Sequence, residues 1–279
     1  MLAGLPGGRR FGMGTLIYRV YVANDPGDPK GSVPLPSVAI REQSGRLVPL
    51  APAGPARQRR LIAVLGLLAR VITRRAKLGD GMATDSADVP QFRLPPSLGG
   101  LLANPDNAYL AAPITWAPGR VVIVRGKAPV FPNTRAGMPA TTPVQLRYWS
   151  LSVGELRNPY PVVQGTPDFE VALDADGYYT FAVSTATDRP RNATPADAVT
   201  WLPWGDTRVP NVLILRNMLP SPDFHQAVQA IPAGATANEI RTIMGPYYPV
   251  AAYCDKSQFE AIGAHGCLDA ALAVRPGST

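Results

Sequence analysis

The sequence predicts a mainly β protein, an antiparallel, jelly-roll-like β-sandwich with a few short peripheral helices. Three observations support this prediction. The 279 residues include 31 prolines and 26 glycines, which interrupt long helices and suit tight turns. Only 17% of the residues are charged and 46% are apolar, so a sizeable core can form. From residue 104 onward, short β-branched and aromatic runs recur with turn-rich gaps and no helical patterns between them, which favours a sandwich over an α/β fold.

Residues 1–56 are predicted to hold a strand and an extended segment rich in proline and glycine. Residues 15–23 alternate large apolar with polar residues and predict a strand. The turn formers of residues 24–32 end it. Residues 33–42 predict a second, edge-like strand, because their prolines would deny hydrogen bonds in the centre of a sheet.

Residues 57–78 are predicted to form an apolar helix with basic ends. Its centre, Leu61–Ile72, is apolar except at Arg70 and is too short to span a bilayer, which needs about 20 residues. We expect it to pack on a sheet or in an oligomer contact, with a peripheral membrane contact as the alternative. Residues 79–103 predict a linker or a long loop, which leaves residues 104–279 for the sandwich core with its C-terminal helices.

The net charge of +7 could indicate a nucleic acid or an anionic membrane surface as a partner. Much of the excess, however, lies in the block at residues 57–77, and the other basic residues are scattered without interleaved aromatic residues. No helix-turn-helix, zinc or ribonucleoprotein-type pattern accompanies the charge. The sequence therefore predicts no nucleic-acid binding.

Five β-rich segments predict the strands of the core. They are residues 109–116, 120–131, 144–155, 178–185 and 211–219. The Asp-Ala-Asp-Gly sequence at 174–177 predicts a hairpin-type turn; it resembles the start of a calcium loop, but the later ligands do not follow. In the C-terminal quarter, Ser221 predicts the N-cap of a short helix through Ala230, and Thr236 with Glu239 has the pattern of a capping box. We expect these helices to cover one end or face of the sheet.

The two cysteines, Cys254 and Cys267, lie close together near the C-terminus. Their spacing predicts a disulfide that closes a small loop, and such bonds persist in oxidising compartments. A pair of reduced thiols is the alternative. The first residues of the chain have basic residues and glycines where a secretory signal has an apolar run, which indicates a trimmed form, a start further upstream or a cytoplasmic protein.

The sequence assigns no catalytic residue, no metal site and no cofactor. Its two histidines, His225 and His265, have no cluster of ligands at metal-binding spacing. The G-x-S-x-G motif of serine hydrolases and the glycine-rich motifs for phosphates and dinucleotides are missing. Residues Asn192–Thr194 form a glycosylation acceptor triplet, which indicates an exposed loop.

One group of residues remains as a candidate ligand-binding site, and we call it the aromatic-arginine set. It consists of Arg147, Tyr148, Trp149, Trp201, Trp204, Asp206 and Arg216. Strand alternation would place Arg147 and Trp149 on one face and Tyr148 on the other. Aromatic rings beside arginine and aspartate suit sugars or other polar cyclic ligands. Alternatively, the tryptophans pack in the core around a rigid turn, and the arginines bond loop carbonyls.

Several segments, taken as an ordered series, carry a resemblance to known proteins. They are residues 104–110, 120–137, 144–155, 178–185, 199–206, 213–224 and 247–267. Over about residues 100–267 the chain resembles secreted, largely actinobacterial proteins of unassigned function. The resemblance implies an extracytoplasmic protein with a sandwich-like core and implies no activity. Members of the group tend to carry cysteines at the positions of Ser152 and Gly165, and a signal peptide, and this chain shows neither.

The function expected from these observations is that of an extracytoplasmic, non-catalytic binding or structural component, located in the periplasm, on the cell surface or outside the cell. Its partner would be a protein or an envelope ligand, and it could be a subunit of an oligomer or of a larger envelope assembly. The alternative is an enzyme that acts on a polar or lipidic small molecule in a pocket at the sandwich mouth. In that case Tyr148 or Asp206 would transfer the proton, and Arg147 or Arg216 would stabilise the anion.

Overall fold

The structure of the protein is a computed structural model. It describes residues 28, 37–42, 44–49, 89–95, 106–157 and 161–273. The chain divides into two compact units, residues 1–65 and residues 66–279. The predicted strand at 15–23 and the predicted helix at 57–78 lie outside the described residues.

The first unit contains a small antiparallel hairpin. Its strands are β1 (Ala39–Arg41) and β2 (Leu47–Pro49). The Glu42 amide donates to the Arg46 carbonyl at 2.9 Å, and the Arg46 Nε donates to the Glu42 carboxylate at 3.0 Å. β1 lies within the segment for which an edge-like strand was predicted. Both strands are mostly exposed, so the hairpin buries little apolar surface.

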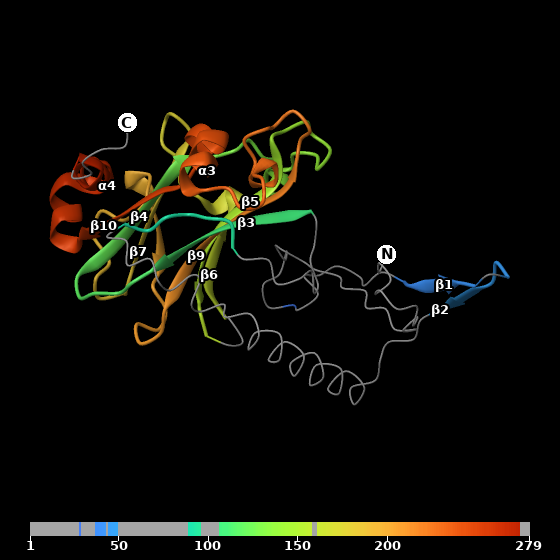
Figure 1. Ribbon diagram of the computed structural model, residues 1–279, viewed down its shortest axis with the longest axis horizontal. Helices are drawn as coiled ribbons and strands as arrows, with labels where there is room; N and C mark the ends of the chain where they lie inside the picture. Colours follow the sequence, from blue (N-terminus) through green and yellow to red (C-terminus); the bar gives the residue numbers. More distant parts are fainter. Residues whose placement is uncertain are drawn as a thin grey trace. The chain divides into compact units, whose positions relative to one another are not determined.

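The second unit is mainly β and is built from two four-stranded sheets (Figure 1). The first sheet has the order β3 (Asn107–Ile114), β9 (Asn211–Pro220), β5 (Leu146–Glu155) and β6 (Val162–Pro167). The second has the order β10 (Val250–Asp255), β4 (Arg120–Lys127), β7 (Tyr178–Ser184) and β8 (Thr200–Pro203). The prediction of a mainly β, sandwich-like fold is therefore confirmed.

One pair of neighbouring strands departs from the predicted antiparallel arrangement. β7 and β8 run parallel, with Phe181 opposite Thr200 and Ser184 opposite Pro203. A parallel pair needs a long crossover between its strands, and residues 185–199 supply it. The jelly-roll connectivity is not established by these strand orders and stays a prediction.

The two sheets face each other around one large apolar core. Because successive residues of a strand point to opposite faces, alternate residues of each strand enter this core. From β5 these are Trp149, Leu151 and Val153, and all three are fully buried. From β7, Tyr179 and Phe181 meet them, with the Tyr179 ring centroid 5.1 Å from that of Trp149. Large aromatic side chains therefore fill the space between the sheets.

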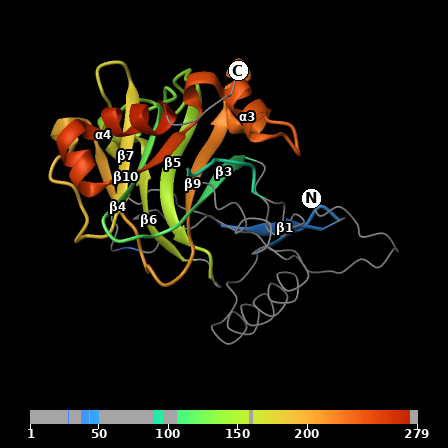
Figure 2. The same cartoon turned by 60° about the vertical axis from the view of Figure 1, so that its left-hand side comes forward.

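The second sheet is also buried on its outer face, where α4 (Lys256–Ala273) lies across β10 and β4 (Figure 2). Val121 and Ile123 of β4 pack against this helix, while the residues that alternate with them enter the core. Burial on both faces explains the continuous apolar run in the sequence of β4. α4 consists of two helical segments joined at Gly263, where a φ of 71° favours glycine.

The predictions for the C-terminal helices are right in one place and wrong in another. α3 (Ala237–Met244) begins with the predicted capping box of Thr236 and Glu239. The predicted α-helix from Ser221 to Ala230 does not form. The short 3-10 turns of this unit are η1 (Thr134–Ala136), η2 (Asp168–Glu170), η3 (Pro195–Asp197), η4 (Val228–Ala230) and η5 (Gly245–Tyr247). Within the described ranges, no helix is long and apolar enough to cross a membrane.

A contact with the first sheet takes one of the backbone amides that this helix would need. The Val228 amide donates to the Asn217 Oδ1 at 3.1 Å, and Asn217 is a buried residue of β9. In a helix from Ser221 to Ala230, this amide would bond to a carbonyl one turn earlier. The side chain of Asn217 competes with that hydrogen bond, so a tertiary contact acts against the local helix signal.

Part of the segment predicted as a linker packs on the sandwich. Of residues 79–103, the structure describes residues 89–95. Phe92 is fully buried in the core, and Arg93 pairs with Ala111 of β3. The described part of this segment therefore belongs to the folded sandwich.

Candidate functional site

The structure separates the aromatic-arginine set and does not gather it around one pocket. Trp149 and Trp204 are 0% and 1% exposed, and both lie in the core between the sheets. Neither forms an exposed binding platform. Trp201 is half-buried; its Nε1 donates to the Ser184 Oγ at 3.0 Å, and the Arg189 guanidinium lies 4.6 Å from the centroid of its ring.

Tyr148 and Arg216 lie on the same face of the first sheet as diagonal neighbours in the register of β5 and β9. The Arg216 guanidinium lies over the Tyr109 ring, 5.2 Å from its centroid. Arg147 precedes Tyr148 in β5 and donates to the Thr142 carbonyl at 3.2 Å. This contact fits the alternative interpretation in which the arginine bonds a loop carbonyl.

Asp206 lies at the far end of β5 from Tyr148. The Asp206 amide donates to Glu155, and the strand from Tyr148 to Glu155 is about 24 Å long at ~3.4 Å per residue. The Asp206 carboxylate pairs with Arg208 at 2.9 Å and with Arg157 at 3.6 Å. Hydrogen bonds from Arg208 hold the pKa of Asp206 well below its ordinary value. Asp206 is therefore a weak base, and it is too distant from Tyr148 to share one small active site.

A different group of polar residues lines a pocket of about 330 Å³ beside α4, which we call the α4 pocket. One part of its lining is the outer face of β4 and β7, with the turn that precedes β7. The second part is the crossover, residues 185–199, and the third is the kink of α4. Residues from β4, from β7 with the crossover that follows it, and from α4 therefore meet here.

Arg125 and Thr180, which are paired across β4 and β7, form one side of the α4 pocket. Alternate residues of a strand share a face, so Arg125 lies on the same face of β4 as Val121 and Ile123, the face that α4 covers. Its guanidinium donates to the Thr180 Oγ1 at 3.0 Å and to the Asp174 Oδ2 at 2.6 Å. The positive charge is therefore paired within the pocket.

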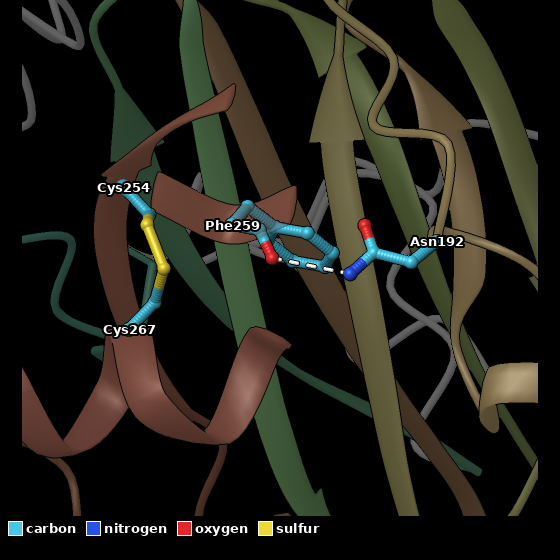
Figure 3. The surroundings of a disulfide bond; sticks show 4 residues. All are labelled: Asn192, Cys254, Phe259 and Cys267. Carbon is cyan, nitrogen blue, oxygen red and sulfur yellow. Dashed lines mark hydrogen bonds between the residues drawn. A yellow bond between two sulfur atoms is a disulfide. The ribbon is translucent and has the colours of Figure 1, made fainter. Parts of the chain in front are cut away.

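Asn192 of the crossover is oriented by a hydrogen bond to α4 (Figure 3). Its Nδ2 donates to the Phe259 carbonyl at 3.1 Å. Its Oδ1 is buried and accepts no hydrogen bond from any described residue. Arg191 and Glu260 hold the same two segments together, since the Arg191 amide donates to the Glu260 carboxylate at 3.0 Å. The crossover is thus attached to α4 at two neighbouring points.

The predicted disulfide between Cys254 and Cys267 is present, with a Cα to Cα distance of 5.9 Å (Figure 3). It links β10 to the second helical segment of α4. The pocket-lining residues of α4, Phe259 and residues 262–265, all lie between the two cysteines in sequence. The disulfide therefore fixes both ends of the segment that forms this wall.

The carboxylates of the α4 pocket are held by hydrogen bonds. Burial alone would raise the pKa of Asp174, but the amide of Tyr178 and the Arg125 guanidinium outweigh it and hold the pKa below its ordinary value. The Asp197 carboxylate accepts a hydrogen bond from the Thr194 hydroxyl at 2.6 Å. Across the residues that the structure describes, no three His, Cys, Asp or Glu side chains come together as a metal site.

None of these residues was predicted to line a site. Asn192 was considered as part of a glycosylation triplet, and Asp174 as part of a hairpin-type turn. His265, for which only a lack of neighbouring metal ligands was inferred, lies in α4, is exposed and lines the α4 pocket. The unassigned residues share no motif, because their proximity depends on the crossover and on the kink in α4.

No family model and no curated protein matches the chain. Among solved structures, it is similar to an uncharacterized protein from Burkholderia cenocepacia, at 15% identity and a TM-score of 0.32. The match covers 70% of this chain and 49% of the other, so this chain spans about half the length of that protein. A TM-score this low supports no inference about fold or function.

Proposed function

We propose that the protein is an extracytoplasmic, non-catalytic binding component that holds a small envelope ligand in the α4 pocket. The observation that carries the proposal is the pairing inside this pocket: Arg125 is bonded to Asp174 and Thr180, and Asn192 to the backbone of α4. Groups that are fixed by one another can position a ligand, and they are poor proton donors and acceptors. The disulfide supports an oxidising compartment outside the cytoplasm.

The sandwich suits this role because it presents a rigid sheet as one side of the pocket. We propose that its connectivity is a variant of the jelly roll with one parallel pair. A structural role, as a subunit of a larger envelope assembly, is compatible with the same proposal, because the ligand could be part of that assembly.

Native mass spectrometry of the oxidised full chain, mixed with small molecules extracted from cell envelopes, tests the proposal. We expect a complex of higher mass from which the ligand can be recovered chemically unchanged. Recovery of a time-dependent product would favour the enzyme alternative instead. Absence of any complex, in extracts prepared from both the envelope and the medium, would overturn the binding role.

A further inference from the structure

We propose that the protein has a second ligand site, at the start of β5, which binds a small carboxylate with an apolar body. The site is a pocket of about 300 Å³ lined by residues 143, 144 and 147 and by residues 219–222, and we call it the Leu219 pocket. It shares no lining residue with the α4 pocket, so the inference does not depend on the function proposed for that pocket. Three features carry it: a guanidinium without an acidic partner, an apolar lining, and a strained leucine.

The guanidinium belongs to Arg147. Its Nη1 donates to the Thr142 carbonyl at 3.2 Å, and among the described residues no carboxylate pairs with it. Its Nε and Nη2 have no hydrogen-bond partner in the described part of the chain and are not enclosed by it, so a ligand can reach both atoms. A guanidinium presents its N–H groups as a planar fork that matches the two oxygens of a carboxylate. The pocket therefore offers an anion a positive charge and directed donors.

No charged group of the lining neutralises this guanidinium. Residues 143–147 and 219–222 include Arg147 as their one charged residue. Asp223 and His225 follow in sequence, but both are exposed and neither lines the pocket. Ser221 does line it, and its hydroxyl accepts a hydrogen bond from the Asp223 amide at 3.5 Å, which leaves the hydroxyl hydrogen to be donated. One positive charge and one hydroxyl suit an anion with a single charge.

The rest of the lining is apolar. It consists of Val144, Leu219 and the three prolines Pro143, Pro220 and Pro222. Proline has no amide hydrogen to donate, so this side of the pocket presents C–H groups. An apolar ligand body would remove them from water, whereas a phosphate or a wholly polar acid would leave them exposed. The volume is near the lower limit for small-molecule sites, which start at about 300 Å³, so the ligand is small.

Leu219 is held against the pocket in a conformation that leucine rarely adopts. Its φ is 47°, in the left-handed region that favours glycine. It lies opposite Arg147, because residues 146 and 148 of β5 pair with residues 220 and 218 of β9. The side chain is 45% exposed, so packing within the fold does not account for a leucine in this strained position. Contact with the apolar body of a ligand does account for it.

The test is a titration of the isotope-labelled, oxidised full chain by two-dimensional NMR, with octanoate, acetate, 1-octanol and octylamine as separate probes. We expect octanoate alone to give saturable shifts at the amides of Arg147, Leu219 and Ser221. Acetate lacks the apolar body, 1-octanol lacks the charge, and octylamine carries the opposite charge. The amides of Gly263 and Ala264, which line the α4 pocket, should not shift with octanoate.

Two variants and a control connect the binding to this pocket. Arg147→Met should weaken octanoate about tenfold, because a charge-assisted hydrogen bond is lost. Arg41→Met, the same change at an exposed arginine of β1, should leave the affinity unchanged. Leu219→Gly should weaken octanoate about fivefold through the lost apolar contact. The urea midpoint of Leu219→Gly should stay close to that of the parent protein, because glycine relieves the left-handed backbone.

Three outcomes would contradict the proposal. If 1-octanol binds as tightly as octanoate, the ligand is not recognised by its carboxylate. If the octanoate shifts are confined to the amides of α4, the ligand lies in the other pocket. The proposal also fails if octanoate gives no saturable shift, or if neither Arg147→Met nor Leu219→Gly weakens its binding. None of these results bears on the α4 pocket's own ligand, for which the envelope extracts are the test.

Discussion

The two apolar layers of the second unit differ in the size of their side chains. The layer between the sheets includes Phe92, Trp149, Tyr179, Phe181 and Trp204. The layer between the second sheet and α4 has one fully buried aromatic residue among its described members, Phe259; the others are the aliphatic residues Val121, Ile123, Val199 and Leu268 and the small residues Ala182, Ala193, Ala252, Cys254, Ala264 and Cys267. Large side chains fill the first layer by themselves. The second layer has fewer buried residues, is crossed by a disulfide and has a pocket at its edge.

The largest expected effect tests whether the layer between the sheets carries most of the stability. Trp149→Ala should lower the free energy of unfolding by about 4 kcal/mol, because it empties a fully buried site next to Tyr179. Trp201→Ala, at a half-buried site on the outer side of the second sheet, should cost about 1 kcal/mol. Urea unfolding of both variants measures the difference. Equal losses would contradict the comparison between the layers.

The next effect concerns the layer between the second sheet and α4. Replacing both Cys254 and Cys267 by alanine should lower the free energy of unfolding by about 3 kcal/mol, because a short loop is no longer closed in the unfolded chain. Backbone amide hydrogen exchange should become faster in α4 and stay slow in β5 and β9. Faster exchange throughout both sheets would show that the disulfide supports the whole sandwich and not this layer alone.

A buried carboxyl beside the large core should make stability depend on pH. Asp168 is 4% exposed and accepts hydrogen bonds from the amides of Trp149 and Phe169. Burial raises the pKa of Asp168 to about 6, although both hydrogen bonds act to lower it. Because the unfolded chain releases this proton at lower pH, the free energy of unfolding should fall as the pH rises from about 4 to about 6, by an amount on the order of 2 kcal/mol.

Asp168→Asn is the matched control for this pH dependence. The amide cannot ionise, so the fall in the free energy of unfolding between about pH 4 and pH 6 should disappear in this variant. Asp174, Asp206, Glu239 and Glu260 have lowered pKa values, so their contributions are lost as the pH falls through the ordinary carboxyl range, which gives a slope of the opposite sign. A free energy of unfolding that still falls with rising pH in Asp168→Asn would assign the effect to another group.

The smallest expected effect concerns the edge of the first sheet. Ser152 of β5 lies opposite Gly165 of β6, and a Cβ at position 165 would lie 3.3 Å from the Ser152 Cβ. This Cβ to Cβ distance is close to the range of about 3.5–4.5 Å found in disulfides. The double variant Ser152→Cys, Gly165→Cys should therefore oxidise to a second disulfide. Intact mass without reductant should show it, with a gain of about 1 kcal/mol in stability. Two free thiols under these conditions would show that β6 does not keep this register.

The strands could be predicted from the sequence where a short run of residues has a high β propensity of its own. Residues 120–127 and 211–220 are dense in valine, isoleucine and leucine, and they form β4 and β9. The capping box at Thr236 is equally local and was predicted correctly. α4 was not predicted, because it is kinked at Gly263 and its apolar residues follow no single helical stripe.

The residues of the candidate site could not be predicted from the sequence. Trp204 and Trp149 were chosen for their chemistry, and only the packing of the two sheets shows that both are buried. Arg125 and Asn192 lie 67 positions apart in a chain with no motif around either. They line one pocket because a crossover links parallel strands and because a glycine bends the covering helix. Neither the crossover nor the kink in the helix has a sequence pattern from which it could be predicted.

The hydrogen bond from the Asn192 Nδ2 to the Phe259 carbonyl has a consequence for how the protein should be produced. The same nitrogen is the atom that a glycosylating host would modify, because Asn192-Ala193-Thr194 is an acceptor triplet. A glycan attached there before folding would occupy the place of α4 and keep the crossover from docking. Material from a secretory eukaryotic host would therefore carry a blocked α4 pocket, whereas a bacterial periplasm would supply the disulfide without the glycan.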